Sequence, residues 1–484
     1  MNNQNNDKQR TELHIAVQEN NLYKVKELIK LQPELLKKKD REGKTALMYA
    51  SINNNVECVR LLVDKEAKEQ DDMGKTALMY AVKNGYAKCA KLLLSEDTKQ
   101  DNTIGKFTAM IYAASSGHVE CVRILMEGFG SIIKDGCINK TALMYAAENG
   151  HYDCARLLVE KIKNYNSIFA FDSNDIIQYR FFRDNEGKNA LMYAAINGYK
   201  NCVELLVRDL KLTEQDKHGK TALMYAAEFN RADIVKFILS LEENGCNLQD
   251  SMGNTALMYA SERGYMDCVK LLLEKEAGKQ DYTGKTALMY ATKNGHINCA
   301  KLLMEKEGRM QDNVGQTALM YSVVSEQTKL IKLLMDKEAK MQVNEFNYTA
   351  LMYAAQQGYE EGIKLLMKKE AGMQDNTDTT ALMYATKNKY INCAKLLMEK
   401  EAEIVDQNNN NVLDYAVSTN NSECVEKIVE CLFNRVDNRQ KVLDFLTKVL
   451  NNKDTKINTK KLVEVYNKIN NEIQTINDLV CFNW

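Results

Sequence analysis

Residues 281–303 read Asp-Tyr-Thr-Gly-Lys-Thr-Ala-Leu-Met-Tyr-Ala-Thr-Lys-Asn-Gly-His-Ile-Asn-Cys-Ala-Lys-Leu-Leu, and the hexapeptide that starts at Thr286 decides the fold because it recurs along the chain. Identical copies of Thr-Ala-Leu-Met-Tyr-Ala begin at Thr45, Thr76, Thr141, Thr221, Thr255, Thr286, Thr349 and Thr380. Variants of it begin at Thr11, Thr108, Asn189, Thr317 and Asn411. The starts are 31 to 34 residues apart, except for one interval of 48 residues. Such a period is the signature of a repeat protein, so the sequence predicts thirteen units with one insertion.

Each unit carries two short helical patterns. In the unit that starts at Thr286, the threonine hydroxyl suits a helix cap, and apolar residues between 287 and 291 follow at helical spacing. Asn294 and Gly295 break this helix, and apolar residues recur at helical spacing between 299 and 303. Helices of about 8 to 11 residues are marginal alone in water. The units must therefore stack and share a core, as the units of solenoid proteins do.

The unit that contains Gly284, Thr286, Gly295 and His296 resembles the ankyrin repeat, and the resemblance covers about residues 11–435. It implies an all-α solenoid of about thirteen helix-turn-helix units. The family's Thr-Pro-Leu-His is replaced by Thr-Ala-Leu-Met, and only His14 keeps the family's histidine. Many units are also shorter than the family's usual length, which predicts short turns.

The array contains one insertion and is flanked by two further segments. Residues 1–10 form a polar N-terminal tail, residues 161–182 form an aromatic-rich insertion, and residues 436–484 form a C-terminal helical segment. Within the last segment, apolar residues between 459 and 480 alternate steps of three and four, which gives one apolar stripe. This stripe fits a helix that caps the last repeat, or alternatively a short coiled coil. We expect a monomer, with a dimer through residues 459–480 as the alternative.

Composition and charge exclude several classes of function. The chain has 65 Lys and Arg against 66 Asp and Glu, without a basic block, so nucleic acid is not an expected partner. No signal peptide and no apolar run long enough to cross a membrane is evident, so we expect a cytoplasmic protein without membrane insertion. The common phosphate-binding, hydrolase, zinc-protease and kinase motifs are missing, so we expect neither an enzyme nor a cofactor.

Cysteine and tyrosine recur at fixed places in the repeat. Nine cysteines lie thirteen residues after the motif start: Cys58, Cys89, Cys121, Cys154, Cys202, Cys268, Cys299, Cys393 and Cys424. Since neighbouring helices lie about 8 to 10 Å apart, these cysteines are too distant to pair easily, and we interpret them as small core residues rather than as redox or metal sites. The tyrosines at the fifth motif position either pack between neighbouring first helices or form a surface that contacts a partner. The packing interpretation is favoured, because residues that select a partner should vary between units.

The candidate partner-binding residues are therefore the irregular ones. One set lies at the variable ends of the first helices: Lys83, Glu148, Glu228, Glu262 and Lys293. The other set is aromatic and lies in the insertion: Tyr165, Phe169, Phe171, Tyr179, Phe181 and Phe182. The insertion residues either anchor a partner or fold back on the adjacent helices.

The resemblance implies binding of protein partners rather than catalysis. Our leading hypothesis is a scaffold or adaptor that binds partners through the concave face and the turn tips of the array. The alternatives are a regulatory or targeting subunit that masks or localises a partner enzyme, and a structural protein that links the cytoskeleton or a membrane to other proteins.

Overall fold

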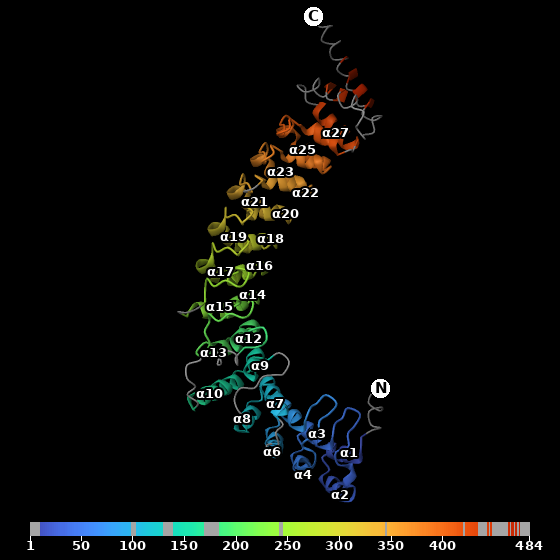
Figure 1. Cartoon of the computed structure of the whole chain (residues 1–484), viewed down its shortest axis with the longest axis vertical. Helices are drawn as coiled ribbons and strands as arrows, with labels where there is room; N and C mark the ends of the chain where they lie inside the picture. The colour runs from blue at the N-terminus through green and yellow to red at the C-terminus, as the bar shows by residue number, and fades with distance from the viewer. Residues whose placement is uncertain are drawn as a thin grey trace. The chain divides into compact units, whose positions relative to one another are not determined.

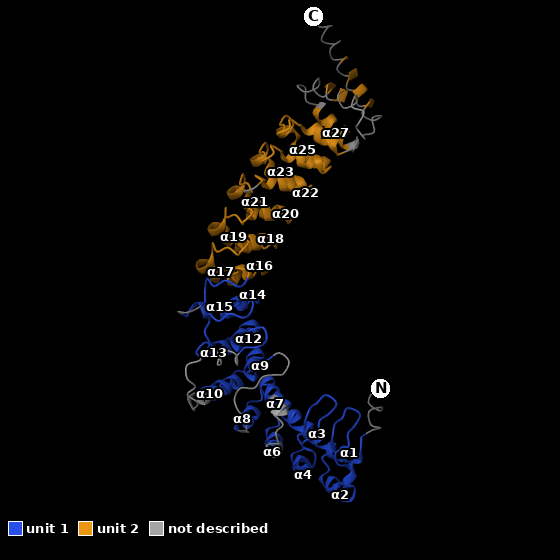
Figure 2. Cartoon of the chain, viewed as in Figure 1, with its two compact units in different colours: residues 1–251 blue, residues 252–484 orange. Residues whose placement is uncertain are grey.

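The computed structural model describes residues 10–97, 103–128, 139–168, 183–241, 245–343, 346–419 and 422–433, together with scattered residues between 443 and 474. The chain forms two compact units, residues 1–251 (unit 1) and residues 252–484 (unit 2) (Figure 2). Within the described ranges the regular structure is helical. The helices form thirteen consecutive pairs, which confirms the predicted all-α repeat architecture (Figure 1).

The described residues of unit 1 form seven helix pairs. Its helices are α1 (Glu12–Gln18), α2 (Leu22–Leu31), α3 (Ala46–Ile52), α4 (Val56–Glu66), α5 (Ala77–Lys83), α6 (Ala87–Asp97), α7 (Thr103–Ser115), α8 (Val119–Gly128), α9 (Ala142–Glu148), α10 (Tyr152–Ile168), α12 (Ala190–Asn197), α13 (Lys200–Leu206), α14 (Ala222–Glu228) and α15 (Ala232–Leu239). A short 3-10 helix, η2 (Pro33–Leu35), follows α2.

The described residues of unit 2 up to Phe433 form six helix pairs. Its helices are α16 (Ala256–Arg263), α17 (Met266–Glu276), α18 (Ala287–Lys293), α19 (Ile297–Glu307), α20 (Ala318–Val324), α21 (Thr328–Glu338), α22 (Ala350–Gln357), α23 (Glu360–Glu370), α24 (Ala381–Lys387), α25 (Ile391–Glu401), α26 (Val412–Ser418) and α27 (Ser422–Phe433). Figure 1 shows the first helices of unit 2 in one row and the second helices in another.

The motif threonine starts the first helix of the repeat. In α5 the hydroxyl oxygen of Thr76 accepts a hydrogen bond of 3.3 Å from the amide of Met79. Asn189 does the same for Met192 in α12, because an asparagine oxygen reaches the same free amide. The helix ends where the chain turns left-handed, for example at Gly264 with φ of 76°.

Stacking supplies the core. Within each unit, a first helix packs on the first helix of the next pair, as in α18 against α20, and on the second helix of its own pair, as in α18 against α19. Leu288, Met289 and Leu303 of the pair α18 and α19 are fully buried by these contacts. Helices of seven or eight residues are thus stable only inside the stack.

The insertion begins as helix. Helix α10 runs to Ile168 and therefore contains the first part of the predicted insertion, while residues 169–182 lie outside the described ranges. The first helices on either side, α9 and α12, pack on each other. The stack of first helices therefore continues past the insertion. The C-terminal stripe of residues 459–480 lies largely outside the described residues.

Candidate protein-binding surface

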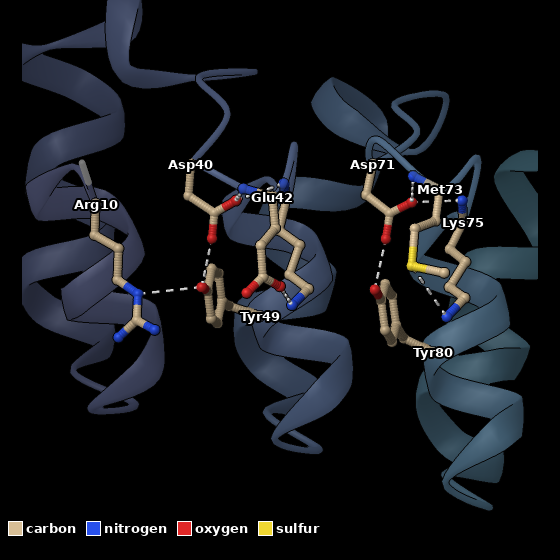
Figure 3. Close-up of polar contacts among 9 residues, drawn as sticks. Arg10, Asp40, Glu42, Tyr49, Asp71, Met73, Lys75 and Tyr80 are labelled. Atoms are coloured by element: carbon tan, nitrogen blue, oxygen red, sulfur yellow. Dashed lines mark hydrogen bonds and ion pairs between the residues drawn. The ribbon is translucent and has the colours of Figure 1, made fainter. Parts of the chain in front are cut away.

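The motif tyrosine is held by an aspartate of the preceding turn. The hydroxyl of Tyr49 donates to Asp40 at 2.6 Å, and that of Tyr80 donates to Asp71 at 2.5 Å (Figure 3). The same hydrogen bond recurs in six further repeats. The pairs are Tyr193 with Asp184, Tyr225 with Asp216, Tyr290 with Asp281, Tyr321 with Asp312, Tyr384 with Asp375, and Tyr415 with Asp406. The second oxygen of Asp71 accepts the amides of Met73 and Lys75, which closes the turn.

The electrostatics of this pair keep the tyrosine neutral. Burial and the hydrogen bond to Asp40 raise the pKa of Tyr49 to about 12. Burial also acts to raise the pKa of Asp40, but the hydrogen bonds from Tyr49 and from the amides of Lys44 and Glu42 outweigh it and lower that pKa below its usual value. The tyrosine hydroxyls are thus occupied inside the repeat, as the packing interpretation predicts.

The repeat that starts at Thr349 departs from this arrangement. The place of the turn aspartate before Tyr353 is taken by buried Val343, and the Tyr353 hydroxyl instead accepts a hydrogen bond of 3.0 Å from Gln316. Tyr348 lies in the same turn. Its ring centroid is 5.9 Å from that of Phe346, 5.8 Å from that of Tyr353 and 5.4 Å from that of Tyr384. This aromatic cluster marks the most irregular turn that the structure describes in unit 2.

The nine repeated cysteines are buried and carry free thiols. Cys89 donates from its sulfur to the side-chain oxygen of Asn54 at 3.4 Å. Burial raises the pKa of Cys121 to about 11, and a nearby glutamate adds to the effect. A thiol that stays protonated and buried is inert, so these positions serve packing, as predicted. Among the described residues, no group of three or more His, Cys, Asp and Glu is placed to hold a metal ion.

Neighbouring turns are tied to each other. In unit 2 the amide of Tyr282 donates to the carbonyl of Met252 at 3.1 Å, and the amide of Asn313 donates to the carbonyl of Thr283 at 3.0 Å. The side chain of Gln280 donates at 2.6 Å to Gly284 in its own turn and at 2.8 Å to the carbonyl of Gln311 in the next. Gln311, Gln342 and Gln374 repeat this arrangement. The turn tips of unit 2 are therefore held at a fixed spacing.

Large apolar side chains project from four successive turns of unit 2. Met252 is 63% exposed, Tyr282 66%, Val314 48% and Phe346 52%. We call these four residues the apolar tip row. Apolar side chains cost free energy in water, and an aligned series of them on a rigid support is typical of a protein contact. The sequence predicted partner contacts at the turn tips, but none of these four residues was a candidate. The repeat pattern does not reveal which apolar side chains are exposed, so it cannot separate these four from the buried apolar residues.

The predicted sites at the first-helix ends differ in their surroundings. Lys83 and Lys293 are exposed. Glu148 pairs with Lys140 at 2.5 Å, and Glu228 pairs with Lys220 at 2.8 Å. Glu262 is half-buried, and its carbonyl hydrogen-bonds to His296 at 2.9 Å.

In the pair of Glu148 and Lys140, the lysine side chain is 5% exposed and the glutamate side chain 33%. The Lys140 ammonium is buried and lies 4.5 Å from the ring centroid of Tyr145 and 3.9 Å from that of Tyr193, as in a cation–π contact. Tyr145 and Tyr193 belong to α9 and α12, so Lys140 joins the two repeats that flank the insertion. Glu148 thus pairs with a lysine that packs between two repeats, and its role in partner binding stays a prediction.

The predicted sites in the insertion lie beyond what the structure describes. Phe169, Phe171, Tyr179, Phe181 and Phe182 fall outside the described residues, and for Tyr165 the backbone alone is described, as part of α10. Their role in partner binding stays a prediction.

Comparison with known families agrees with the geometry. The family model for three copies of the ankyrin repeat matches residues 13–104, 96–168, 171–247, 239–313, 307–376 and 368–441. A stack of helix pairs joined by hydrogen-bonded turns defines an ankyrin solenoid. The chain belongs to the ankyrin-repeat family, whose members are generally protein–protein interaction modules. The search of curated proteins finds no match. Of the described residues, none belongs to a helix that is both long and apolar enough to cross a bilayer.

Proposed function

We propose that the protein is a non-enzymatic scaffold or adaptor that binds a protein partner along the turn tips of unit 2. The apolar tip row carries this proposal. Interfaces obtain most of their affinity from a few large side chains, with aromatic residues enriched among them, and Tyr282 and Phe346 are the most exposed aromatic residues of unit 2 that the structure describes.

The rigidity of the support favours this surface over the repeated rows. The hydrogen bonds from Gln280 and Gln311 fix neighbouring turns before a partner arrives. Ordering a flexible surface on binding costs free energy, so a preformed row of tips binds more tightly than mobile loops would. The motif tyrosines are less suited to this role, because their hydroxyls are already bound to aspartates.

The test begins by capturing the partner from native lysate with the full chain and purifying it. The dissociation constant is then measured for the wild type, for the double variant Tyr282→Ser/Phe346→Ser, and for the control Tyr23→Ser. Tyr23 is 80% exposed but lies on α2 in unit 1. Loss of two anchoring side chains should weaken binding at least about tenfold, since each such residue contributes about 1 to 2 kcal/mol or more, and the control should bind normally.

An unchanged dissociation constant for the double variant would show that the partner binds elsewhere than at the apolar tip row. Turnover of a substrate by the purified protein alone would contradict the non-enzymatic role. If the partner is an enzyme, its rate should be the same with and without the bound solenoid, because a scaffold holds its partner without altering the partner's chemistry.

A further inference from the structure

A buried glutamate ends the second helix of several repeats, always twenty-one residues after the motif threonine. We call these residues the bridging glutamates: Glu66 in unit 1, and Glu276, Glu307, Glu338, Glu370 and Glu401 in unit 2. Each is 1–2% exposed. A carboxyl group is rarely so deeply buried unless hydrogen bonds compensate for the lost water.

The two oxygens of a bridging glutamate have different partners. One oxygen of Glu338 accepts the amide of Leu319 at 2.7 Å, at the start of the first helix of its own repeat. The other oxygen accepts the amide of Arg309 at 3.2 Å, which lies in the loop after α19 of the preceding repeat. A single side chain therefore joins two repeats and also satisfies a free amide at a helix start.

The same geometry repeats without interruption. Glu307 accepts Leu288 at 2.7 Å and Gly278 at 3.0 Å. Glu370 and Glu401 make the equivalent pairs of bonds with the corresponding leucine and with the loop of the repeat before them. Five consecutive repeats of unit 2 carry such a glutamate.

Two repeats of unit 1 differ at this position. Glu66 links the first two repeats through the amides of Leu47 and Lys37. In the repeats that start at Thr141 and Asn189, however, the position holds Ile162 and Leu210. These apolar side chains have no atom that can accept an amide hydrogen bond.

We infer that the bridging glutamates couple the repeats of unit 2, from α16 to α25, into one block that opens cooperatively. The physical reason is that opening one repeat would leave a buried carboxyl group in its neighbour without its hydrogen-bond donor. Such a loss is more costly than the loss of apolar contact alone. In a solenoid the balance between repeat stability and interface energy sets the size of the opening unit, so strong interfaces enlarge it.

The experiment is native-state hydrogen exchange on the full chain at increasing denaturant, followed by mass spectrometry. Wild-type peptides from α18 to α25 should lose protection in one correlated step. Peptides from α7 to α13, where Ile162 and Leu210 replace the bridging glutamate, should lose it in several steps. Glu338→Gln should split the unit 2 step between the repeats that start at Thr286 and Thr317, with a loss of protection of at least about tenfold at the amides that the carboxyl group accepted. Glu370→Gln should move the split to the next interface, between the repeats that start at Thr317 and Thr349.

Glu305→Gln is the matched control. Glu305 lies on α19 and pairs at 2.9 Å with Lys337 across the same interface that Glu338 bridges, but its side chain is 71% exposed. The variant Glu305→Gln also replaces a carboxyl group by an amide, and it should leave the single step of exchange in unit 2 intact. The inference is overturned if Glu305→Gln splits the step as Glu338→Gln does, if both bridging variants keep one step, or if either variant abolishes protection throughout unit 2 instead of splitting it.

Discussion

The carboxyl group of Glu307 accepts the backbone amide of Leu288 at 2.7 Å, so the end of helix α19 is bonded to the start of helix α18 in the same repeat. This bond closes each bridged repeat on itself, while the second oxygen of the carboxyl group reaches the preceding repeat. Because the group is buried, its protonation state is linked to the stability of unit 2.

The stability of unit 2 should depend on pH. Burial, the first cause, raises the pKa of Glu307, Glu338, Glu370 and Glu401 above the ordinary 4.5, although hydrogen bonds to each of them act in the opposite direction. A raised folded-state pKa means that the stability contribution is complete below the unfolded pKa and is lost as the pH rises through the folded pKa. The urea midpoint of unit 2, followed by exchange of its peptides, should therefore be higher at pH 5 than at pH 8.

Two features serve as checks on this pH effect. The pKa values of Asp281 and Asp406 are lowered by their hydrogen bonds against the opposing effect of burial, so their contribution is lost below pH 4 and does not enter the range from 5 to 8. Glu307→Gln, which cannot ionise, should reduce the difference between the two midpoints. An equal difference in this variant would show that other groups cause it.

Arg309 should be replaceable by glycine with a gain in stability. Its φ is 75°, in the left-handed region, and Gly278 holds the equivalent position one repeat earlier with φ of 85°. The left-handed conformation costs a non-glycine residue about 1 to 2 kcal/mol, and the extra chain freedom of glycine costs about 0.4 to 1 kcal/mol. Arg309→Gly should thus raise the free energy of unfolding by about 0.5 to 1 kcal/mol in denaturant titration.

The reverse change, Gly278→Ala, should lower stability by a similar amount. A β carbon at Gly278 would meet nothing within 4 Å, so its effect is conformational alone. If Arg309→Gly destabilises the protein, the arginine side chain contributes more than its backbone strain costs.

Removing the hydroxyl of a motif tyrosine that is bonded to an aspartate should lower the free energy of unfolding. Tyr321→Phe removes a hydrogen bond of 2.7 Å to Asp312 and should cost about 1.5 to 3 kcal/mol, because the acceptor is a carboxylate. Tyr353→Phe is the matched control in the next repeat, where Gln316 is a neutral partner, and should cost about 0.5 to 1.5 kcal/mol. Thermal or denaturant unfolding measures both, and equal losses would remove the special role of the aspartate.

Leu272→Ala should cost about 2 to 5 kcal/mol, since Leu272 of α17 is fully buried. Hydrogen exchange should show the loss within the coupled block of unit 2, while peptides of unit 1 keep their protection. Equal loss in both units would contradict a stack in which repeats contact only their neighbours.

Much of this fold could be predicted from the sequence, because the same motif occurs in repeat after repeat. The helix starts at Thr76 and Thr286 and the internal role of Cys89 and Cys299 follow from residue type and spacing alone. The partners of Glu307 and Gln280 could not be predicted, because they depend on which backbone groups the stacked repeats bring near. The available signal was their recurrence: the glutamate lies twenty-one residues after the motif threonine, and the glutamine lies six or seven residues before it.

The candidate site was harder to predict for the same reason. Glu148 and Glu228 looked like variable surface residues, yet the stack places each beside a lysine, Lys140 or Lys220. Met252 and Phe346 were not among the candidates, yet their side chains are 63% and 52% exposed at the turns. Variation between repeats indicates candidate partner-binding positions. The exposure of each side chain decides which of these positions a partner can contact.

The most direct test of the proposed binding surface is hydroxyl-radical footprinting of the protein with and without its purified partner. Met252, Tyr282 and Phe346 should be labelled in the free protein, because they are exposed, and should lose labelling in the complex. Met73 and Tyr23 of unit 1, which are 78% and 80% exposed, should be labelled equally in both samples. Unchanged labelling of the apolar tip row in a saturated complex would contradict the account.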